Sequence, residues 1–158
     1  MKKYELTGEV KVKFGVTFKR IRALIDFGNV KKGELGGFIE KEENLSHENN
    51  AWVYDDAWVS GNAEVYDDAW VYGDAWVSGN AEVSGNADYV LIGRVGSRFG
   101  FTTFFRNKNN EIYVSCGCFL GTLAKFRKKV KETHGTDTKY AKVYQAAADL
   151  AEMQILNK

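Results

Sequence analysis

Side chains around a glycine-rich segment, residues 92–100, have the types and spacing that anion binding would use. Glycine lets backbone N–H groups approach an anion, and arginine binds phosphate or carboxylate through two hydrogen bonds. The segment has no Walker or dinucleotide fingerprint, so a simple glycine-rich bend is the alternative. The candidate ligand-binding residues of this group are Arg94, Ser97, Arg98, Thr102, Thr103 and Arg106.

A dense run of basic residues forms a second candidate surface. It consists of Lys125, Arg127, Lys128, Lys129 and Lys131. Such a surface attracts nucleic acid, a phosphorylated ligand or an acidic protein partner. The sequence contains no known DNA-binding motif, so it does not support sequence-specific DNA recognition. A solvated helix face is the alternative.

The histidines and cysteines offer nucleophilic or acid–base chemistry. Cys116 and Cys118 lie two residues apart, on one face of an expected strand, and His134 ends an expected helix. A cysteine activated by a nearby histidine is a nucleophile, but buried structural cysteines and a histidine at a helix C-terminus are the alternatives. Two cysteines are too few for a zinc site and poorly spaced for a disulfide, so no metal site is expected.

The elements that must position these groups are organised around a repeat at residues 51–86. Six consecutive hexads share the frame Ala-x-Val-x-x-x, and a period of 18 residues lies above the period of six. Residues 51–68 and 69–86 differ at only four positions. Self-similarity at a fixed short period predicts a solenoid, and a six-residue period favours a β-helix.

Each hexad predicts one short strand followed by a turn. Alternate residues of a strand face the same side, so the valines and alanines of the frame should fill the interior. Asp-Asp, Gly-Asn and Gly-Asp follow the strands and are typical turn residues. Stacked coils lie about 4.8 Å apart. The 18-residue period therefore predicts three stacked pairs: Trp52 over Trp70, Trp58 over Trp76, and Glu64 over Glu82.

All four tryptophans lie in the repeat, at positions expected to face outward. They are Trp52, Trp58, Trp70 and Trp76. Exposed apolar rows mark interaction surfaces, so the tryptophans predict an oligomer interface, with a homotrimer as the expected assembly. The alternative is that terminal segments of the same chain fold over them.

The flanks of the repeat predict other elements. Residues 4–25 alternate apolar and polar side chains and read as strand that covers the open end of the solenoid. Residues 89–92, 100–105 and 112–115 predict three further strands. Helices are expected over residues 123–134 and 139–155; Thr122 is suited to cap the first, and Gly135 to end it.

The repeat resembles the left-handed β-helix hexapeptide repeat, with Val53 and Ala57 in its two constrained positions and so on to Val83 and Ala87. The resemblance implies a left-handed parallel β-helix, often trimeric and often found in acyltransferases. On that basis His47, beside the repeat, becomes a candidate base for an enzyme that uses acyl-CoA. The chain also resembles uncharacterised phage and prophage β-helix proteins that carry a transferase label, through the stretches IRAL (21–24), LGGFI (35–39) and CGCFLGT (116–122).

The expected fold is therefore mainly β, in three parts. Strands at residues 1–37 cap the solenoid, residues 38–88 form the β-helix, and residues 89–158 form a small α+β domain of order β-β-β-α-α. The charge divides in a similar way. Residues 1–37 carry nine basic and four acidic side chains, residues 38–90 one and twelve, and residues 91–158 twelve and five. The net charges are thus +5, −11 and +7, which favours an anionic partner or attraction between parts of the protein.

The composition excludes several classes of protein. Apolar residues make up 44% and charged residues 27% of the 158 residues, as in a globular chain. A membrane span is not expected, because no apolar run reaches about 18 residues. The N-terminus lacks the apolar stretch of a signal peptide, and two cysteines fit a reducing compartment. We therefore expect a protein of the bacterial host cytoplasm.

The sequence favours a non-enzymatic oligomer of phage type. Its basic C-terminal domain would bind an anionic target and inhibit host defence, either by sequestering a nucleotide-like signal or by blocking a defence protein. The ligand would be held by the arginines and hydroxyls of the glycine-rich segment, in a cleft between subunits and without a cofactor. One alternative is the acyltransferase that uses acyl-CoA; another is a structural or assembly protein of the phage particle.

Overall fold

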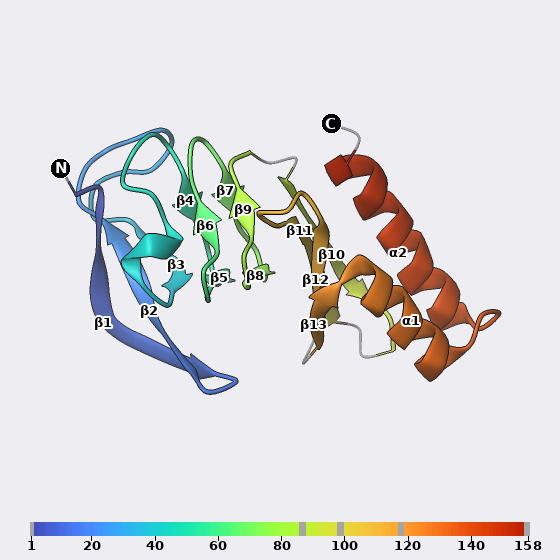
Figure 1. The fold of residues 1–158 in the computed structure, drawn as a ribbon. Helices are drawn as coiled ribbons and strands as arrows, with labels where there is room; N and C mark the ends of the chain where they lie inside the picture. Colours follow the sequence, from blue (N-terminus) through green and yellow to red (C-terminus); the bar gives the residue numbers. More distant parts are fainter. Residues whose placement is uncertain (1, 86–87, 98–99, 117–118, 157–158) are drawn as a thin grey trace. The chain divides into compact units, whose positions relative to one another are not determined.

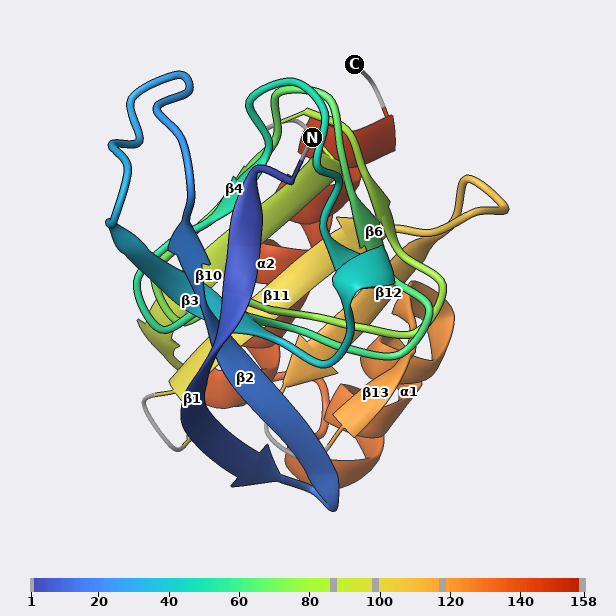
Figure 2. The same cartoon turned by 90° about the vertical axis from the view of Figure 1, so that its left-hand side faces the viewer.

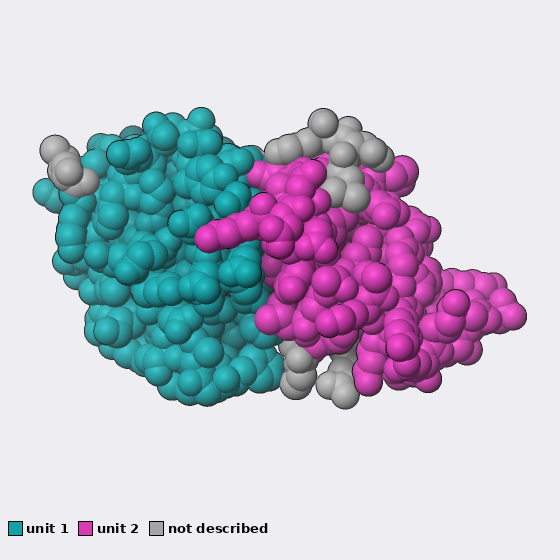
Figure 3. Space-filling model, viewed as in Figure 1, with its two compact units in different colours: residues 1–86 teal, residues 87–158 magenta. Residues whose placement is uncertain are grey.

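The computed structural model describes residues 2–85, 88–97, 100–116 and 119–156. The fold is mainly β, with two α-helices and several sheets (Figure 1). Two compact units divide the chain, residues 1–86 and residues 87–158 (Figure 3). The finer division of the first unit into a capping part and a repeat part stays a prediction.

The described residues of the first unit, 2–85, form nine strands and one short 3-10 helix. Its elements are β1 (Tyr4–Lys13), β2 (Val16–Ala23), β3 (Leu35–Ile39), η1 (Glu42–Asn44), β4 (Trp52–Val53), β5 (Trp58–Val59), β6 (Glu64–Val65), β7 (Trp70–Val71), β8 (Trp76–Val77) and β9 (Glu82–Val83).

The repeat forms coils of 18 residues that stack through parallel pairs. Strand β4 pairs with β7, β5 with β8 and β6 with β9. The three predicted pairs are confirmed: Trp52 faces Trp70, Trp58 faces Trp76, and Glu64 faces Glu82. The register follows from the sequence because residues 18 apart are equivalent in the repeat.

The apolar side chains of the repeat fill the inside of the coils, as predicted. Each of the following is at most 1% exposed: Val53, Val59, Val65, Val71, Val77, Val83, Ala51, Ala57, Ala63, Ala69, Ala75 and Ala81. Burying a valine side chain contributes roughly 1.5–3 kcal/mol, so this column is a main source of stability in the unit.

The corners of the coils use backbone conformations that favour glycine and aspartate. Asp55 and Gly61 have φ angles of 54° and 63°. A Cβ atom on Gly61 would lie 3.1 Å from the backbone nitrogen of Gly79 in the next coil. The Gly-Asn corner therefore needs glycine both for its positive φ and for the close approach of the two coils.

The N-terminal segment is a hairpin of two strands, so the alternation that predicts one strand pattern over residues 4–25 is interrupted by a turn. Phe14 and Gly15 have φ angles of 51° and 77° and reverse the chain. Phe18 then pairs with Lys11 on one face of the hairpin, while Val12 lies on the other face. Because the chain reverses at Phe14, the apolar residues before and after it point in opposite directions.

The hairpin extends one side of the coils. Strand β1 pairs with β2, β2 with β3, and β3 runs parallel to β5, in a five-stranded sheet of order β1-β2-β3-β5-β8. Figure 2 shows β1 and β2 crossing in front of the coils, with the end of the hairpin reaching beyond them.

The second unit is an antiparallel sheet with two helices. Its elements are β10 (Tyr89–Val95), β11 (Gly100–Arg106), β12 (Ile112–Cys116), β13 (Phe119–Thr122), α1 (Leu123–His134) and α2 (Lys139–Leu156). The order β-β-β-α-α is incomplete, since the sheet has four strands in the order β10-β11-β12-β13. Strand β13 has only four residues and leads directly into α1, so its strand pattern is too short to recognise.

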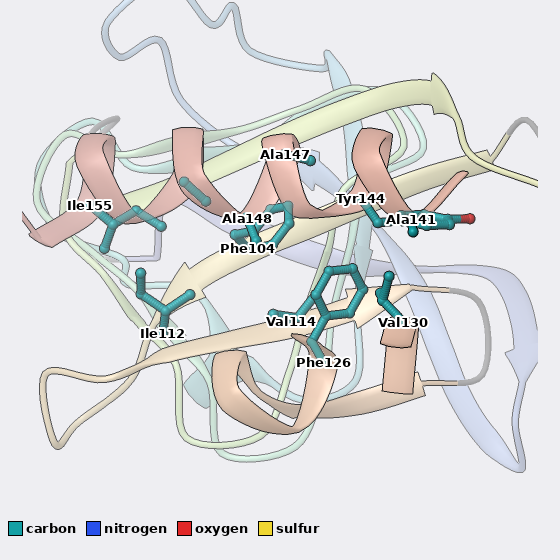
Figure 4. Packing of buried hydrophobic residues seen from close by; sticks show 11 residues of the cluster. Phe104, Ile112, Val114, Phe126, Val130, Ala141, Tyr144, Ala147, Ala148 and Ile155 are labelled. Carbon is teal, nitrogen blue, oxygen red and sulfur yellow. The ribbon is translucent and has the colours of Figure 1, made fainter. Parts of the chain in front are cut away.

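Both predicted helices are confirmed. The Thr122 hydroxyl accepts a hydrogen bond from the Lys125 amide at 3.2 Å, and Gly135 ends α1 with a φ of 77°. The two helices pack on the sheet, α1 against β12 and β13 and α2 against β10 and β11. Phe104 and Val114 of the sheet meet Phe126 of α1 and Tyr144 of α2 in this core (Figure 4).

Candidate anion-binding site

A basic hollow is formed by α1, α2 and the turn that joins them. Its volume is about 430 Å³. It is lined by Arg127, Lys128, Lys131, Gly135, Thr136 and Gln145. Residues three and four apart are neighbours on a helix, so Lys131 lies beside both Lys128 and Arg127 on the side of α1 that lines the hollow.

The Arg127 side chain lines this hollow but is held in place by hydrogen bonds and ion pairs to α2. Its guanidinium donates to Gln145 Oε1 and to Asp149 Oδ1 of α2, each at 2.8 Å. Glu152 lies 3.5 Å away. Gln145 Nε2 in turn donates to the Arg127 carbonyl oxygen at 3.3 Å. The α2 carboxylates therefore offset the charge of Arg127 and hold the two helices together.

Lys128 and Lys131 supply the net charge of the hollow. Both side chains are exposed, and in the described part of the chain neither forms an ion pair. Two ammonium groups beside the Thr136 hydroxyl give an arrangement of donors with no acidic side chain among the residues that line the hollow. Such a set attracts phosphate or carboxylate.

The predicted basic surface is thus divided by the structure. Arg127, Lys128 and Lys131 line the hollow, whereas Lys125 and Lys129 are exposed on α1 and do not line it. Gln145 and Thr136 were missed by sequence reasoning, because their place beside α1 depends on how the two helices pair. From the sequence, only the prediction that Gly135 ends the first helix indicated where the turn between α1 and α2 lies.

The structure describes four of the six predicted ligand-binding side chains around the glycine-rich segment, namely Ser97, Thr102, Thr103 and Arg106, and their role in ligand binding stays a prediction. The Ser97 amide donates to the hydroxyl of Tyr144 at 3.2 Å. Thr102 and Thr103 are buried, and the Thr102 hydroxyl donates to Cys116 Sγ at 3.2 Å. The side chain of Arg94 and all of Arg98 lie outside what the structure describes.

Arg106 has a structural role in the second unit. Its Nε donates to Oδ1 of the buried Asp88 at 2.9 Å, and its other nitrogens donate to Asn110 and to the Ile155 carbonyl oxygen. These bonds tie β11 to the β11–β12 turn and to the end of α2. The side chain thereby has few donors left for a ligand.

His47 stands in the first unit, against the N-terminal strand. Its ring stacks on Tyr4 with 4.1 Å between ring centroids, and its Nδ1 accepts a hydrogen bond from the Lys3 amide at 3.1 Å. Nε2 lies 3.9 Å from Glu42 Oε1. Burial lowers the pKa of His47, although the Glu42 carboxylate opposes that shift. Because the amide occupies the Nδ1 lone pair, the neutral ring carries its proton on Nε2.

The neutral imidazole in this arrangement has no free lone pair with which to take a proton. A general base needs one within reach of its substrate. To act as one, His47 would have to give up the Lys3 amide or move its proton between the ring nitrogens. The role of His47 in catalysis stays a prediction.

Trp52 is covered by the N-terminal segment of the same chain, which is the alternative to an oligomer interface at this position. It is completely buried, with the rings of Tyr4 and Phe27 packed edge-on against it at 6.2 and 5.2 Å. Trp58 and Trp76 stack at 5.0 Å, and Phe14 lies 5.3 Å from Trp76. The N-terminal segment of the same chain therefore covers much of the tryptophan surface.

The other three tryptophans, Trp58, Trp70 and Trp76, are partly exposed, and their role in an oligomer interface stays a prediction. The Cys116 thiol is half-buried, and Cys118 lies outside the described residues. His134 stacks on Tyr144 at 5.6 Å. Within the described ranges, no cluster of three or more histidine, cysteine, aspartate or glutamate side chains could hold a metal ion. The helices found there are also not long and apolar enough to cross a bilayer.

Fold and site together define a mainly β protein in which a parallel-paired repeat precedes an α+β unit with a basic hollow. No protein-family model matches the chain. The chain is 36% identical over 63 residues to the "Uncharacterized acetyltransferase YdcK" of Escherichia coli (strain K12). That match covers 35% of the chain but 19% of the relative, so the chain spans about a fifth of that protein. This likeness gives loose support to a hexapeptide-repeat protein.

Proposed function

We propose that the protein binds a small phosphate- or carboxylate-bearing molecule in the hollow between α1 and α2, and that it does so without catalysis. The observation that carries the proposal is the pair Lys128 and Lys131, which face the hollow without an acidic partner in the described chain. Lysine is a point charge that suits phosphate, and Thr136 adds a hydroxyl donor.

The size of the hollow favours a compact ligand. A volume of about 430 Å³ lies in the range of small-molecule sites, roughly 300–1,000 Å³, and suits a molecule up to the size of a nucleotide. To sequester such a molecule the protein would only have to bind it, and no chemical reaction would be needed. This agrees with the proposed sequestration of a nucleotide-like signal by a phage protein, with the first unit, as a left-handed β-helix, acting as scaffold.

Two matched double variants test the proposal. Calorimetric titration of the whole chain with ATP, inorganic pyrophosphate and citrate would detect an anion site. We expect Lys128→Gln with Lys131→Gln to weaken binding at least tenfold. Lys125→Gln with Lys129→Gln removes the same charge from the same helix outside the hollow and should change binding less than twofold. Equal losses in both variants, or no binding of any of the three anions, would overturn the proposal.

A second candidate function is acyl transfer, which the likeness to an uncharacterised acetyltransferase favours. In that reaction the thioester bond of acyl-CoA breaks, the acyl group bonds to an acceptor oxygen or nitrogen, and a base takes the acceptor proton. His47 is the candidate base. Thiol release from acetyl-CoA that is lost in His47→Asn would support the enzyme, whereas unchanged release in that variant would exclude His47 as its base.

A further inference from the structure

The end of the β1–β2 hairpin is an exposed knob that carries apolar and basic side chains. Val10, Val12 and Phe14 are 52%, 64% and 57% exposed. Lys11 and Lys13 alternate with them along β1. Figures 1 and 2 show that this end of the hairpin projects past the coils of the first unit. The hairpin covers part of the tryptophan surface, but its own end exposes a further set of apolar side chains.

The two lysines of the knob hold uncompensated charge. Their ammonium groups lie over the Trp58 ring, 5.3 and 5.4 Å from its centroid, and make no ion pair within the described residues. The neighbouring arginines differ, because Arg20 pairs with Glu9 and Asp56, and Arg22 with Glu5. The positive charge of the hairpin is therefore concentrated near its end.

A hollow of opposite character lies on another side of the same unit. Its volume is about 540 Å³. It is lined by acidic side chains (Glu42, Glu43 and Glu64), apolar or aromatic ones (Leu45, Val65 and Tyr66), and by Ser46 and His47. Glu64 stacks over Glu82 of the next coil, which extends the negative charge. Glu43, Glu64 and Glu82 make no ion pair in the described part of the chain.

We infer that the hairpin knob of one copy docks into the acidic hollow of a second copy. The two surfaces are complementary in charge, with Lys11 and Lys13 against Glu43 and Glu64. Apolar character adds to the fit, because the exposed part of the Phe14 ring can pack against Tyr66, the half-buried aromatic side chain of the hollow. Opposite potentials of this kind steer association and fix its register.

Pairing through the edge of β1 is a poorer arrangement for a second copy. A bulge interrupts the strand between Leu6 and Val10. Bulges and lysines are common protections of an open sheet edge. The knob-and-hollow contact leaves this protected edge unpaired.

The contact is head-to-tail, since the knob and the hollow are different surfaces. Such contacts close into rings or continue as filaments. A small, charged interface gives weak association that depends on salt, because screening lengths are only about 8 Å at physiological ionic strength. The inference concerns the first unit alone and does not depend on the anion site of the second.

Charge reversal tests the contact. Sedimentation velocity of the whole chain from about 10 to 500 μM should show association that weakens as sodium chloride is raised. The knob variant, Lys11→Glu with Lys13→Glu, and the hollow variant, Glu43→Lys with Glu64→Lys, should each weaken association at least tenfold. An equimolar mixture of the two variants should associate again, because each knob then meets a hollow of opposite charge.

Two further variants complete the experiment. Lys31→Glu with Lys32→Glu makes the same charge change elsewhere in the first unit and should leave association within twofold of the wild type. Phe14→Ser should weaken it without changing charge. A wild-type chain that stays monomeric throughout the range would overturn the inference. Association that persists in the knob variant, or a mixture that fails to associate, would overturn it as well.

Discussion

The backbone amide of Lys3 donates a hydrogen bond to Nδ1 of His47, 44 residues later in the chain, at 3.1 Å. The same lysine sends its ammonium group inward, where Nζ donates to the Ala51 carbonyl oxygen at 2.6 Å. One residue directly before β1 thus holds both ends of residues 47–51, the segment that leads into the first regular coil.

His47 should make the stability of the fold sensitive to mild acid. Its pKa is lower in the folded protein than the ordinary value of about 6.5, so the unfolded chain binds the proton more readily. The free energy of unfolding should therefore fall as pH drops below about 6.5. Urea denaturation at a series of pH values would measure this slope.

His47→Asn is the matched variant for that measurement, since its amide oxygen can accept from Lys3 without titrating. We expect the slope between about pH 5 and 7 to be smaller in this variant than in the wild type. If the unfolding free energy had the same slope against pH in both proteins, the protonation of His47 would not be the cause of the pH dependence.

Lys3→Met should destabilise the first unit by about 1–3 kcal/mol at neutral pH. The Lys3 side chain is buried, and besides Ala51 its Nζ contacts the carbonyl oxygens of Glu48 and Asn49, each at 3.4 Å. The methionine fills the space but leaves these acceptors without a donor. Thermal and urea unfolding would give the difference, with the exposed Lys32→Met as control.

The Lys3 ammonium group should also make the free energy of unfolding of the wild type depend on pH in mild base. Burial lowers the pKa of Lys3 to about 8, against the opposing effect of Asp68. Between about pH 8 and 10.5 the unfolded chain therefore holds the proton more firmly than the fold does. The free energy of unfolding should rise with pH across that window, and this rise should be absent in Lys3→Met.

Gly36→Ala should be among the most disruptive single changes in the first unit. An added Cβ would lie 2.6 Å from the Val53 carbonyl oxygen and 2.7 Å from side-chain atoms of both Ile21 and Trp52. The backbone oxygen cannot move without disturbing the coil, so we expect a loss of about 3 kcal/mol in unfolding free energy. Gly8→Ala, where no atom lies within 4 Å of the added Cβ, is the control.

Arg106→Met should destabilise the second unit, because it leaves the buried Asp88 carboxylate without this partner. Removal of one member of a buried ion pair costs about 3–5 kcal/mol. Arg106 was also predicted from the sequence as a ligand residue. A variant that stays folded but loses anion binding selectively, with unchanged urea denaturation, would contradict the structural role and favour the ligand role.

The sequence predicted the repeat well because each coil is specified locally. The valine and alanine positions recur every six residues, and equivalent residues lie 18 apart, so spacing alone gives the stacked pairs from Trp52 over Trp70 onward. The cap at Thr122 and the stop at Gly135 are local in the same sense, since a helix end depends on the few residues around it.

The hairpin shows where local patterns fail. Alternation of apolar residues from Val10 to Phe18 is compatible with one strand or with two strands separated by a tight turn. Only the positive φ angles of Phe14 and Gly15 decide between them. The same turn determines that Phe18 is buried and that Val12 is exposed.

The sequence by itself thus determined the coil register, the two helices and the presence of a basic surface. Tertiary structure decided that Trp52 is covered by Tyr4 and Phe27, that Arg106 serves Asp88, and that Lys128 and Lys131 share a hollow with Thr136. The physical reason is the separation of the partners along the chain. A repeat carries its own spacing, whereas contacts between distant elements depend on how those elements pack.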